Sequence, residues 1–316
     1  MGPSSIGTNG MRPMSTAFIA LDWGTSSLRA YLVDADGAIR DRRAGNQGIL
    51  SVEGGAFEAV FEHCVAGWDP DLPVLGSGMI TSRQGWMEVG YVAAPAGLPD
   101  LVRGMSRMRT ASGRQLAFVP GVSVRGGNGI PDVIRGEETQ ILGALEGSGG
   151  LFVTRGTHCK WVAVESGRIV RFATFMTGEM FAVLRLHGIL GRLMTGEPGV
   201  GQDFERGVRL GLSERTVGAG LLHSLFSVRT LGLLGDLPGE ALASYLSGLL
   251  IGAEIAQALQ MFAPDTRQGL TIIGAREQAM AYKSALDIAG IASRLGPDDA
   301  AVRGLAKIGR QAGGMA

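Results

Sequence analysis

The chain reads Phe18-Ile-Ala-Leu-Asp-Trp-Gly-Thr-Ser-Ser-Leu-Arg-Ala-Tyr-Leu-Val33 near its start, an apolar run that halts at Asp22 to Thr25 and then resumes. Two hydrophobic segments around a short polar turn predict a β-hairpin. Gly24 lets backbone amides approach an anion closely, and the hydroxyls of Thr25 and Ser26 can donate to it. Asp22 would repel a phosphate, so this carboxylate suits the site only with a divalent cation, usually Mg²⁺, between the two.

Such a turn on its own is more often an ordinary surface turn, but the same layout returns at Leu151-Phe-Val-Thr-Arg-Gly-Thr-His-Cys-Lys-Trp-Val-Ala-Val164. When Gly24-Thr25 is laid on Gly156-Thr157, 132 residues later, we expect both flanking strands to superpose in register. A hairpin that recurs once per half-chain predicts two similar domains, each offering a Gly-Thr tip to a ligand in the cleft between them.

Three side chains near the tips have two interpretations each. Arg29 and Lys160 follow the two tips on the return strands, where they can pair with phosphate or be ordinary solvated strand charges. His158 lies inside the second tip, where its imidazole can donate to a phosphate oxygen or to a substrate, or can simply stabilise the turn.

Composition indicates a globular chain without a strong overall charge. Of 316 residues, 45% are hydrophobic and 18% are charged, and Lys+Arg and Asp+Glu number 29 each. This balance favours neither nucleic acid nor an anionic membrane as a partner. Residues 1–16 are rich in turn formers and predict a disordered leader. Cys64 and Cys159 predict no disulfide framework, which fits a reduced, cytoplasmic setting.

Hydrophobic periodicity divides the chain into two α/β halves, residues 17–148 and 149–316. The first half follows the order βββαβαβα, which predicts a mixed sheet with helices on its faces. Its second and third helices are expected over 98–108 and 134–145.

The second half repeats the three strands and then departs from the first. We interpret residues 195–236 as an insertion, with helices expected over 201–212 and 216–228. The apolar segment from Ser244 to Phe262 has helical spacing with polar interruptions, which favours a buried helix over a membrane span. Gly248 and Gly252 lie in this segment, four residues apart, and predict close packing against another helix.

Five motifs, in this order, carry a resemblance to a known family. They are Asp22-Trp-Gly-Thr-Ser-Ser-Leu-Arg29, Arg135-Gly-Glu-Glu-Thr-Gln140, Gly156-Thr-His-Cys-Lys-Trp-Val162, Met176-Thr-Gly-Glu179 and Leu246-Ser-Gly-Leu-Leu-Ile-Gly-Ala-Glu254. Over roughly residues 17–300 the chain resembles the 2-dehydro-3-deoxygalactonokinase family, within the acetate and sugar kinase, Hsp70 and actin superfamily. The resemblance implies two ribonuclease-H-like (actin-like ATPase) domains, each a mixed β-sheet flanked by helices, with the active site in the cleft between them.

The resemblance also implies an activity, the ATP- and Mg²⁺-dependent phosphorylation of 2-dehydro-3-deoxy-D-galactonate to its 6-phosphate, a step of galactonate catabolism. A kinase of another keto-deoxy sugar acid, such as 2-dehydro-3-deoxygluconate, is one alternative. A non-enzymatic ATP switch of the actin or Hsp70 kind is an alternative of another class. The oligomeric state stays open, a homodimer included.

Related sugar kinases keep a catalytic Asp at the helix start where this chain has Arg135-Gly-Glu-Glu138. The resemblance therefore implies Glu137 as the base that orients the substrate hydroxyl, with Glu138 as the second choice. Both are first-turn carboxylates, and such residues more often only stabilise the start of a helix.

The segment from Gly76 to Trp86 has the small residues, hydroxyls and single basic side chain that suit a sugar acid. Arg83 is expected to pair with the carboxylate, because a guanidinium matches a carboxylate in two hydrogen bonds. The other candidates on this side are Ser77, Thr81 and Ser82 for hydroxyl groups, Trp86 as an apolar plate, and Arg135. A glycine-rich surface loop is the alternative interpretation.

The nucleotide is expected at the start of a helix in the second half. Thr177, Gly178 and Glu179 open this helix, where backbone N–H groups have no partner within the helix. Gly274 follows a strand and is expected to pack against adenosine. Two departures from the family pattern fall here: Arg155 stands where Pro is usual, and a small-residue turn is replaced by Gly274-Ala-Arg-Glu277.

Overall fold

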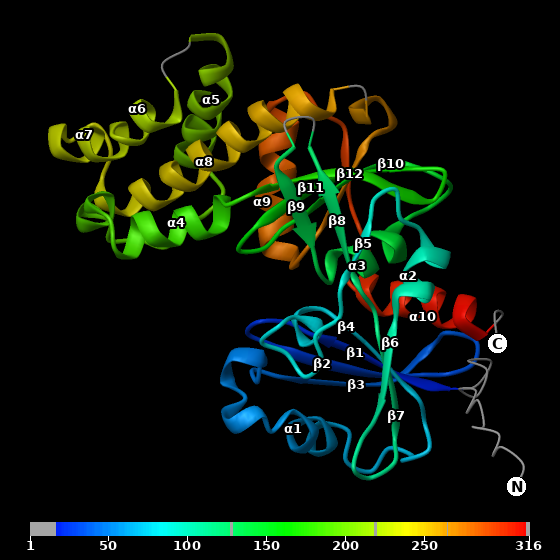
Figure 1. Ribbon diagram of the computed structural model, residues 1–316. Helices are drawn as coiled ribbons and strands as arrows, with labels where there is room; N and C mark the ends of the chain where they lie inside the picture. Colours follow the sequence, from blue (N-terminus) through cyan, green and yellow to red (C-terminus); the bar gives the residue numbers. More distant parts are fainter. Residues whose placement is uncertain (1–16, 127–128, 218–219, 264, 314–316) are drawn as a thin grey trace, which may run out of the picture. The chain divides into compact units, whose positions relative to one another are not determined.

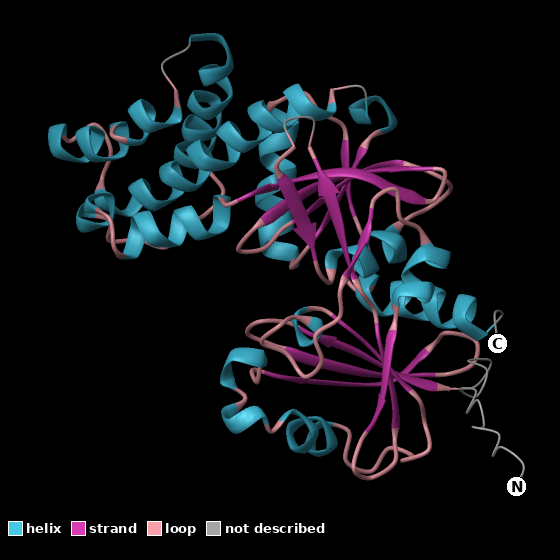
Figure 2. Ribbon diagram, viewed as in Figure 1, coloured by secondary structure: helices cyan, strands magenta, loops and turns pink. Residues whose placement is uncertain are grey.

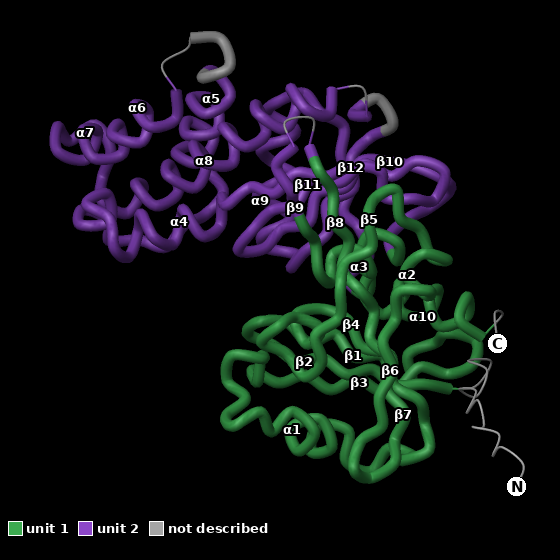
Figure 3. The backbone as a smooth tube through the Cα atoms, viewed as in Figure 1, with its two compact units in different colours: residues 1–125, 133–143, 299–316 green, residues 126–132, 144–298 purple. Residues whose placement is uncertain are grey.

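The computed structural model describes residues 17–126, 129–217, 220–263 and 265–313, so the predicted leader lies outside the described residues. The chain forms two compact units (Figures 1 and 3). Unit 1 contains the chain up to Arg125, Val133–Gly143 and the chain from Asp299 onward. Unit 2 contains Gly126–Asp132 and Ala144–Asp298.

Unit 1 is built on a mixed sheet, whose strands are drawn in magenta in Figure 2. Its six strands have the order β3-β2-β1-β4-β7-β6. Strands β1 to β3 are antiparallel, β1, β4 and β7 are parallel, and β6 is antiparallel to β7. The strands are β1 (Phe18–Trp23), β2 (Leu28–Val33), β3 (Ile39–Gly45), β4 (Val74–Ser77), β6 (Ser106–Arg109) and β7 (Gln115–Phe118). The helices of this unit are α1 (Phe57–Cys64), α2 (Leu98–Gly104), α3 (Glu137–Ala144) and α10 (Ala300–Gly313).

The helix predicted over 98–108 is wrong in its last part, because α2 ends at Gly104 and β6 follows. A Cβ at Gly104 would lie 2.9 Å from Val92 and 3.0 Å from Pro120, so the chain packs too closely there for a larger residue. Ser106–Arg109 then pairs with β7 and alternates half-buried and exposed side chains, as an edge strand does. Pairing with a distant strand overrides the local helical pattern.

A small sheet of order β5-β8-β9 was not predicted. Its strands are β5 (Tyr91–Ala93), β8 (Gly121–Arg125) and β9 (Pro131–Ile134). Because β9 extends to Ile134, the helix predicted over 134–145 begins only at Glu137.

Unit 2 repeats the plan with a sheet of five strands in the order β12-β11-β10-β13-β14. The strands are β10 (Gly150–Thr154), β11 (Cys159–Glu165), β12 (Arg168–Phe175), β13 (Leu270–Ile273) and β14 (Ser293–Leu295). Here too three strands are antiparallel and the following two are parallel to β10. The shared order confirms the predicted α/β class and the ribonuclease-H-like plan of both sheets.

One detail of the repeat was predicted wrongly. In β1–β2, Asp22 pairs with Arg29, whereas in β10–β11 the equivalent Thr154 pairs with Lys160. The second tip is therefore one residue shorter, so the return strands do not superpose in register when the Gly-Thr pairs are aligned. Lys160, rather than Trp161, takes the place of Arg29.

Helices make up the rest of unit 2. They are α4 (Thr177–Leu186), η4 (Ile189–Leu193), α5 (Gln202–Val217), α6 (Leu221–Leu225), α7 (Ser227–Leu234), α8 (Gly239–Phe262), η5 (Asp265–Gln268) and α9 (Arg276–Ile288). The segment predicted as one helix over 216–228 contains the whole of α6 and the start of α7, and Gly220 before α6 has a φ of 79°, which no α-helix continues.

The close helix packing predicted from Gly248 and Gly252 is confirmed, because α8 lies directly against α5. A Cβ at Gly248 would come within 2.0 Å of the Phe204 carbonyl, and one at Gly252 within 2.4 Å of the Val208 carbonyl. Helix α8 is long and apolar enough to cross a membrane, but 78% of its most apolar window is buried inside the protein.

Each unit has its own hydrophobic core. Trp23, Phe61 and Phe118 lie in that of unit 1, and Trp161 and Tyr282 in that of unit 2. Their burial removes large aromatic surfaces from water, the main source of stability for a core.

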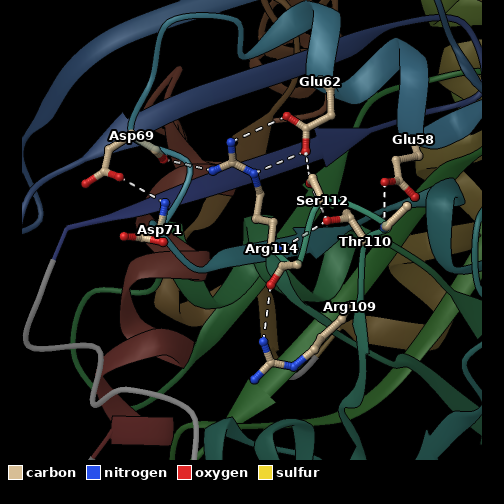
Figure 4. A network of polar contacts seen from close by, with 10 residues as sticks. Glu58, Glu62, Asp69, Asp71, Arg109, Thr110, Ser112 and Arg114 are labelled. Carbon is tan, nitrogen blue, oxygen red and sulfur yellow. Dashed lines mark hydrogen bonds and ion pairs between the residues drawn. The ribbon is translucent and has the colours of Figure 1, made fainter.

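A polar network joins α1 to the β6–β7 hairpin in unit 1 (Figure 4). Arg114, only 4% exposed, donates to the Glu62 carboxylate and to the Asp69 carbonyl at 2.9 Å. Glu58 accepts from the Ala111 amide at 2.7 Å in the turn of the same hairpin. The charge of Arg114 is thus paired where its side chain is buried.

Candidate active site

The first Gly-Thr tip is a closed turn whose outer side has room for a ligand. The Gly24 amide donates to the Ser27 carbonyl at 2.9 Å, and the Ile49 amide donates to the Gly24 carbonyl at 3.0 Å. A Cβ at Gly24 would come no closer than 3.7 Å to other atoms, so the fold itself does not require glycine there. A ligand that approaches the backbone gives a reason for glycine at this position.

Asp22 lies at the end of β1, beside this tip. Its carboxylate is 3.4 Å from the Arg29 guanidinium, with side-chain exposures of 13% and 51%. Burial raises the pKa of Asp22, the Arg29 charge opposes this shift, and the nearby Glu137 charge adds to it. Asp22 and Glu137 are therefore close enough to interact, although 115 positions separate them in the sequence.

Two glycines bring the loop after β4 and the start of α3 to the same place. Gly78 has a φ of 94°, and a Cβ on it would lie 2.9 Å from the Trp23 carbonyl and 3.5 Å from the Asp22 carboxylate. Gly136 has a φ of 103°, and a Cβ on it would lie 3.1 Å from the Cα atom of Gly78. Only glycine fits these conformations and contacts easily, so the three segments meet backbone to backbone.

The two glutamates that begin α3 lie in different environments. Glu138 is 1% exposed, and its two carboxyl oxygens accept from the Gly136 amide at 2.9 and 2.7 Å. Burial, reinforced by the charge of Glu137, raises the pKa of Glu138 to about 8. Glu137 is only half-buried and accepts from the Arg135 amide at 2.8 Å. Glu137 is thus the more accessible of the two residues.

Two of the three predicted substrate hydroxyls have partners within unit 1. Ser77 Oγ lies 3.4 Å from Thr139 Oγ1, and Thr81 Oγ1 donates to the Gly78 carbonyl at 3.0 Å. The hydroxyl of Ser82 is buried without a hydrogen-bond partner among the described residues. Of the three, Ser82 therefore has the clearest capacity to bind an added polar group.

The remaining residues of this segment divide between solvent and core. Arg83 is exposed, as a residue that pairs with an incoming carboxylate must be. The ring centroid of Trp86 lies 5.8 Å from that of Phe61 and 6.1 Å from that of Phe118, so this half-buried ring packs against the core of unit 1. Its role as a plate for the substrate stays a prediction.

The side chain of Arg135 faces the protein. Its guanidinium donates to the Thr81 carbonyl at 2.7 Å, to the Thr81 hydroxyl, and to the Val89 carbonyl at 2.8 Å. It also lies over the Tyr91 ring, 4.3 Å from the centroid. These contacts differ from the direct substrate contact that was predicted.

The second tip, in unit 2, lies against the start of α4. The Glu179 amide donates to the Thr157 carbonyl at 2.9 Å, and the Glu179 carboxylate pairs with the ring of His158 at 2.5 Å. A Cβ at Gly178 would come within 2.5 Å of the Gly156 carbonyl, so glycine permits this contact. A Cβ at Gly156 would meet nothing closer than 3.8 Å, as at Gly24.

Lys160 and Gly274 complete the nucleotide-side candidates. Lys160 is only 6% exposed and its ammonium group donates to the His158 carbonyl at 3.3 Å, so it is not a solvated strand charge. Gly274 has a φ of 153°, and a Cβ on it would lie 3.0 Å from the Cβ atom of Arg155. The predicted residues Gly156, Thr157, His158, Lys160, Thr177, Gly178, Glu179 and Gly274 thus surround one end of the unit 2 sheet.

Sequence reasoning assigned no role to Glu254, a buried carboxylate in the middle of α8. It accepts from Trp161 Nε1 at 2.8 Å and from the hydroxyls of Thr177 and Tyr282. Burial raises the pKa of Glu254, and these three hydrogen bonds oppose the shift. A carboxylate in the apolar middle of the helix was the available signal, and its partners lie too far away in sequence to be identified from it.

Arg155 extends this cluster toward the second tip. Its guanidinium donates to the Gly156 carbonyl at 3.0 Å and lies over the Tyr282 ring at 5.3 Å. Its Nε atom is buried without a partner among the described residues. The residue that departs from the family pattern therefore places a guanidinium beside the second Gly-Thr tip.

Within the residues that the structure describes, no group of three or more His, Cys, Asp or Glu side chains could hold a metal ion. Mg²⁺ needs no such group, because one or two carboxylates together with substrate phosphates commonly hold it. Asp22, a carboxylate at the end of β1 beside the open Gly24 tip, can serve as such a ligand in its ionised form.

Comparison with known proteins gives one consistent family. A family model described as 2-keto-3-deoxy-galactonokinase matches residues 22–308. The 2-dehydro-3-deoxygalactonokinase of Escherichia coli (strain K12) is 32% identical over 279 residues, covering 88% of this chain and 91% of the relative. A probable 2-dehydro-3-deoxygalactonokinase of Rhizobium meliloti (strain 1021) is 35% identical over 297 residues, covering 92% and 96%.

A solved structure agrees with these matches. The crystal structure of a putative 2-dehydro-3-deoxygalactonokinase from Sinorhizobium meliloti superposes with a TM-score of 0.85 at 33% identity. The match covers 93% of this chain and 98% of that chain.

Proposed function

Because the chain belongs to the 2-keto-3-deoxy-galactonokinase family, we propose that it transfers the γ-phosphoryl group of ATP to the O6 hydroxyl of 2-dehydro-3-deoxy-D-galactonate. The products are ADP, the 6-phosphate and a proton. The observation that carries this proposal is the meeting of Asp22, the Gly24 tip and Glu137 at one corner of unit 1. Phosphoryl transfer needs a metal-side carboxylate, a phosphate cradle and a base for the hydroxyl, and these residues supply all three.

In this proposal Glu137 is the base. It takes the proton of O6 as that oxygen attacks the γ-phosphorus, while the bond from phosphorus to the β–γ bridging oxygen breaks. Glu137 is half-buried and reaches solvent. Glu138 is buried, has both oxygens directed at the Gly136 amide and is largely protonated at neutral pH with a pKa of about 8. A carboxyl group that already holds a proton cannot accept another one.

Phosphate binding is assigned to the Gly-Thr tip of each unit. Arg29 and Lys160, at equivalent positions after the tips, and Arg155 provide positive charge. His158 and the amides that open α4 lie around the second tip. We infer that Asp22 holds Mg²⁺, which would neutralise charge on the β- and γ-phosphates when bound.

We infer that the sugar acid binds through the segment after β4. Arg83 would pair with the carboxylate and Ser82, whose hydroxyl has no partner among the described residues, with a sugar hydroxyl. A cytoplasmic setting fits an enzyme that consumes ATP, and a homodimer stays a prediction that analytical ultracentrifugation can test.

The test is an ADP-release assay with Mg-ATP on the wild type, Glu137→Gln and the control Glu53→Gln. Each enzyme is offered 2-dehydro-3-deoxygalactonate, its gluconate epimer, galactonate or no sugar. We expect the wild type to turn over 2-dehydro-3-deoxygalactonate. In Glu137→Gln the kcat should fall by about 10²- to 10⁴-fold. The control Glu53→Gln should keep the wild-type kcat, because the side chain of Glu53 is exposed.

Other outcomes would change the proposal in defined ways. Equal turnover with both epimers would keep the kinase and widen its substrate range. ADP release that ignores every sugar acid would favour the ATP switch instead. Full activity of Glu137→Gln would remove Glu137 as the base.

A further inference from the structure

Arg135 connects two segments of unit 1 that carry different parts of the proposed site. It follows β9 and precedes α3, and its side chain reaches the segment between β4 and β5. Its backbone amide donates to the Glu137 carboxylate at 2.8 Å. One residue therefore contacts both the proposed substrate segment and the proposed base.

The segment in question is a loop, residues 82–88, whose two ends lie side by side. The Val89 amide donates to the Thr81 carbonyl at 3.0 Å, and this bond closes the loop. Within it the structure has turns and bends but no helix or strand. Loops of this kind depend on side chains for a fixed shape.

The guanidinium of Arg135 holds both ends of this loop. One terminal nitrogen donates to the carbonyl and hydroxyl of Thr81, and the other donates to the carbonyl of Val89 at 2.8 Å. The planar group also stacks on Tyr91 and its Nε lies 3.4 Å from the Tyr91 hydroxyl. A lysine could replace one of these bonds but not the planar fork.

The same contacts argue against direct binding of the substrate by Arg135. A carboxylate bound in the usual two-bond geometry needs two N–H groups on one edge of a guanidinium. Both terminal nitrogens of Arg135 already donate to protein carbonyls, at 2.7 and 2.8 Å. Arg83 lies within the loop and is exposed, so its guanidinium can face a ligand.

We propose that Arg135 is a positioning residue, which fixes the 82–88 loop so that Arg83 and Ser82 meet the sugar acid, and which does not bind the carboxylate itself. This inference rests on the proposed function for its substrate. Its structural part, the fixing of the loop, holds independently of the reaction.

The first experiment compares the sugar acid with its C1 amide, which lacks the negative charge. Variants Arg135→Lys, Arg83→Ala and the control Arg103→Ala are assayed with both substrates. Arg103 is an exposed residue of unit 1 whose partner is Asp100 on the same helix. We expect Arg135→Lys to raise the KM for the acid by about tenfold, a loss of ~1.4 kcal/mol, and that for the amide by less, with the KM for ATP unchanged. Combined with Arg83→Ala, the same change should add little to the KM for the acid, because the arginine that the loop positions is then absent.

Arg83→Ala should raise the KM for the acid and leave that for the amide nearly unchanged, and Arg103→Ala should change neither. If Arg135→Lys raises the KM for the acid by the same factor with and without Arg83→Ala, Arg135 is itself the carboxylate ligand and the proposal is overturned. No penalty with either substrate would also overturn it.

The second experiment needs no activity. Hydrogen exchange of the free protein is measured in the wild type, Arg135→Lys and Arg103→Ala. Faster exchange across residues 82–89 in Arg135→Lys alone would support the positioning role, and unchanged exchange would refute it. If the wild type fails to phosphorylate the sugar acid, the proposed function falls while this measurement still decides the role of Arg135.

Discussion

Glu138 has both carboxyl oxygens on a single backbone amide, inside the protein and next to another carboxylate. Such a group is easier to bury with its proton than without it, because a charge loses more than a neutral group does when it leaves water. Glu137, one residue earlier, keeps its access to solvent. Two adjacent residues of the same type thus differ in chemistry because of their surroundings alone.

This difference predicts a pH dependence of stability. The pKa of Glu138 is raised from 4.5 to about 8 in the folded protein, so the folded state holds the proton more tightly than the unfolded state. The resulting stabilisation is complete below about pH 4.5 and is lost as the pH rises through about 8, with a slope of up to about 1.4 kcal/mol per pH unit.

Glu138→Gln, which resembles the protonated acid, should remove this contribution. Urea unfolding between pH 5 and 8.5 gives the free energy of unfolding of the wild type and of the variant. We expect the wild type to lose stability relative to the variant as the pH rises. The exposed Glu53→Gln should follow the wild type at every pH. Parallel curves for wild type and Glu138→Gln would contradict the raised pKa.

Replacing a glycine of the second tip should weaken ATP binding without weakening the fold. A Cβ at Gly156 has room in the protein, so Gly156→Ala should fold with nearly unchanged stability. If phosphates approach this backbone, the added methyl group should weaken ATP binding by at least about tenfold, ~1.4 kcal/mol. Calorimetric titration with Mg-ATP, with Gly201→Ala as a control in open space, checks this. Equal affinity of both variants would place the phosphates elsewhere.

Within each unit, contacts between segments that are far apart in sequence hold the helices and strands together. In unit 2, α5 and α8 approach so closely that Gly248 and Gly252 contact the backbone of the other helix. In unit 1, Arg114 joins the β6–β7 hairpin to α1 and to the turn before β4. The first kind of contact depends on small residues and the second on a paired buried charge.

Arg114→Ala should therefore destabilise the protein. The change removes two sets of hydrogen bonds and the contact with the Phe61 ring at 5.7 Å, while Glu62, about one-third exposed, can still reach water. We expect a loss of about 2 kcal/mol in the free energy of unfolding, with unchanged kcat for the folded enzyme. Arg109→Ala, an exposed arginine on the same hairpin, should cost less than about 0.5 kcal/mol. Similar losses for the two variants would refute the importance of the buried pair.

The whole molecule consists of two units of the same plan with separate cores. The proposed site residues divide between them: Asp22, the Gly24 tip, the 82–88 loop and Glu137 belong to unit 1. The second tip, the start of α4 and Gly274 belong to unit 2.

This division predicts where each ligand slows hydrogen exchange. ADP should protect residues 155–160 and 177–181 of unit 2, and the sugar acid should protect residues 78–90 and 135–139 of unit 1. Each ligand should slow hydrogen exchange in the segments that we propose bind it, because a bound ligand stabilises the closed local structure. Protection of the unit 1 segments by ADP alone would reverse the assignment.

Local patterns in the sequence were sufficient for the repeated hairpins, the α/β class and the glycine contact of α8, whereas the candidate glutamates came from the family resemblance. These features depend on short-range rules: alternation in strands, periodicity in helices, and glycine where backbone must approach backbone. The β6 strand was missed, because its pairing with β7 outweighs the helical pattern of its own residues. The second tip was predicted one residue too long, because the register depends on strand pairing and not on the Gly-Thr motif.

The sequence by itself determined which residue types are present at the site and in what order, and it identified the family through them. Only the tertiary structure decided the surroundings and partners of each of them. It separates Glu137 from Glu138 by burial, gives Glu254 partners on three other elements, and places Arg135 on the ends of a loop rather than toward solvent. The physical reason is that burial, charge pairing and hydrogen bonding act between residues that are distant in sequence and adjacent only after folding.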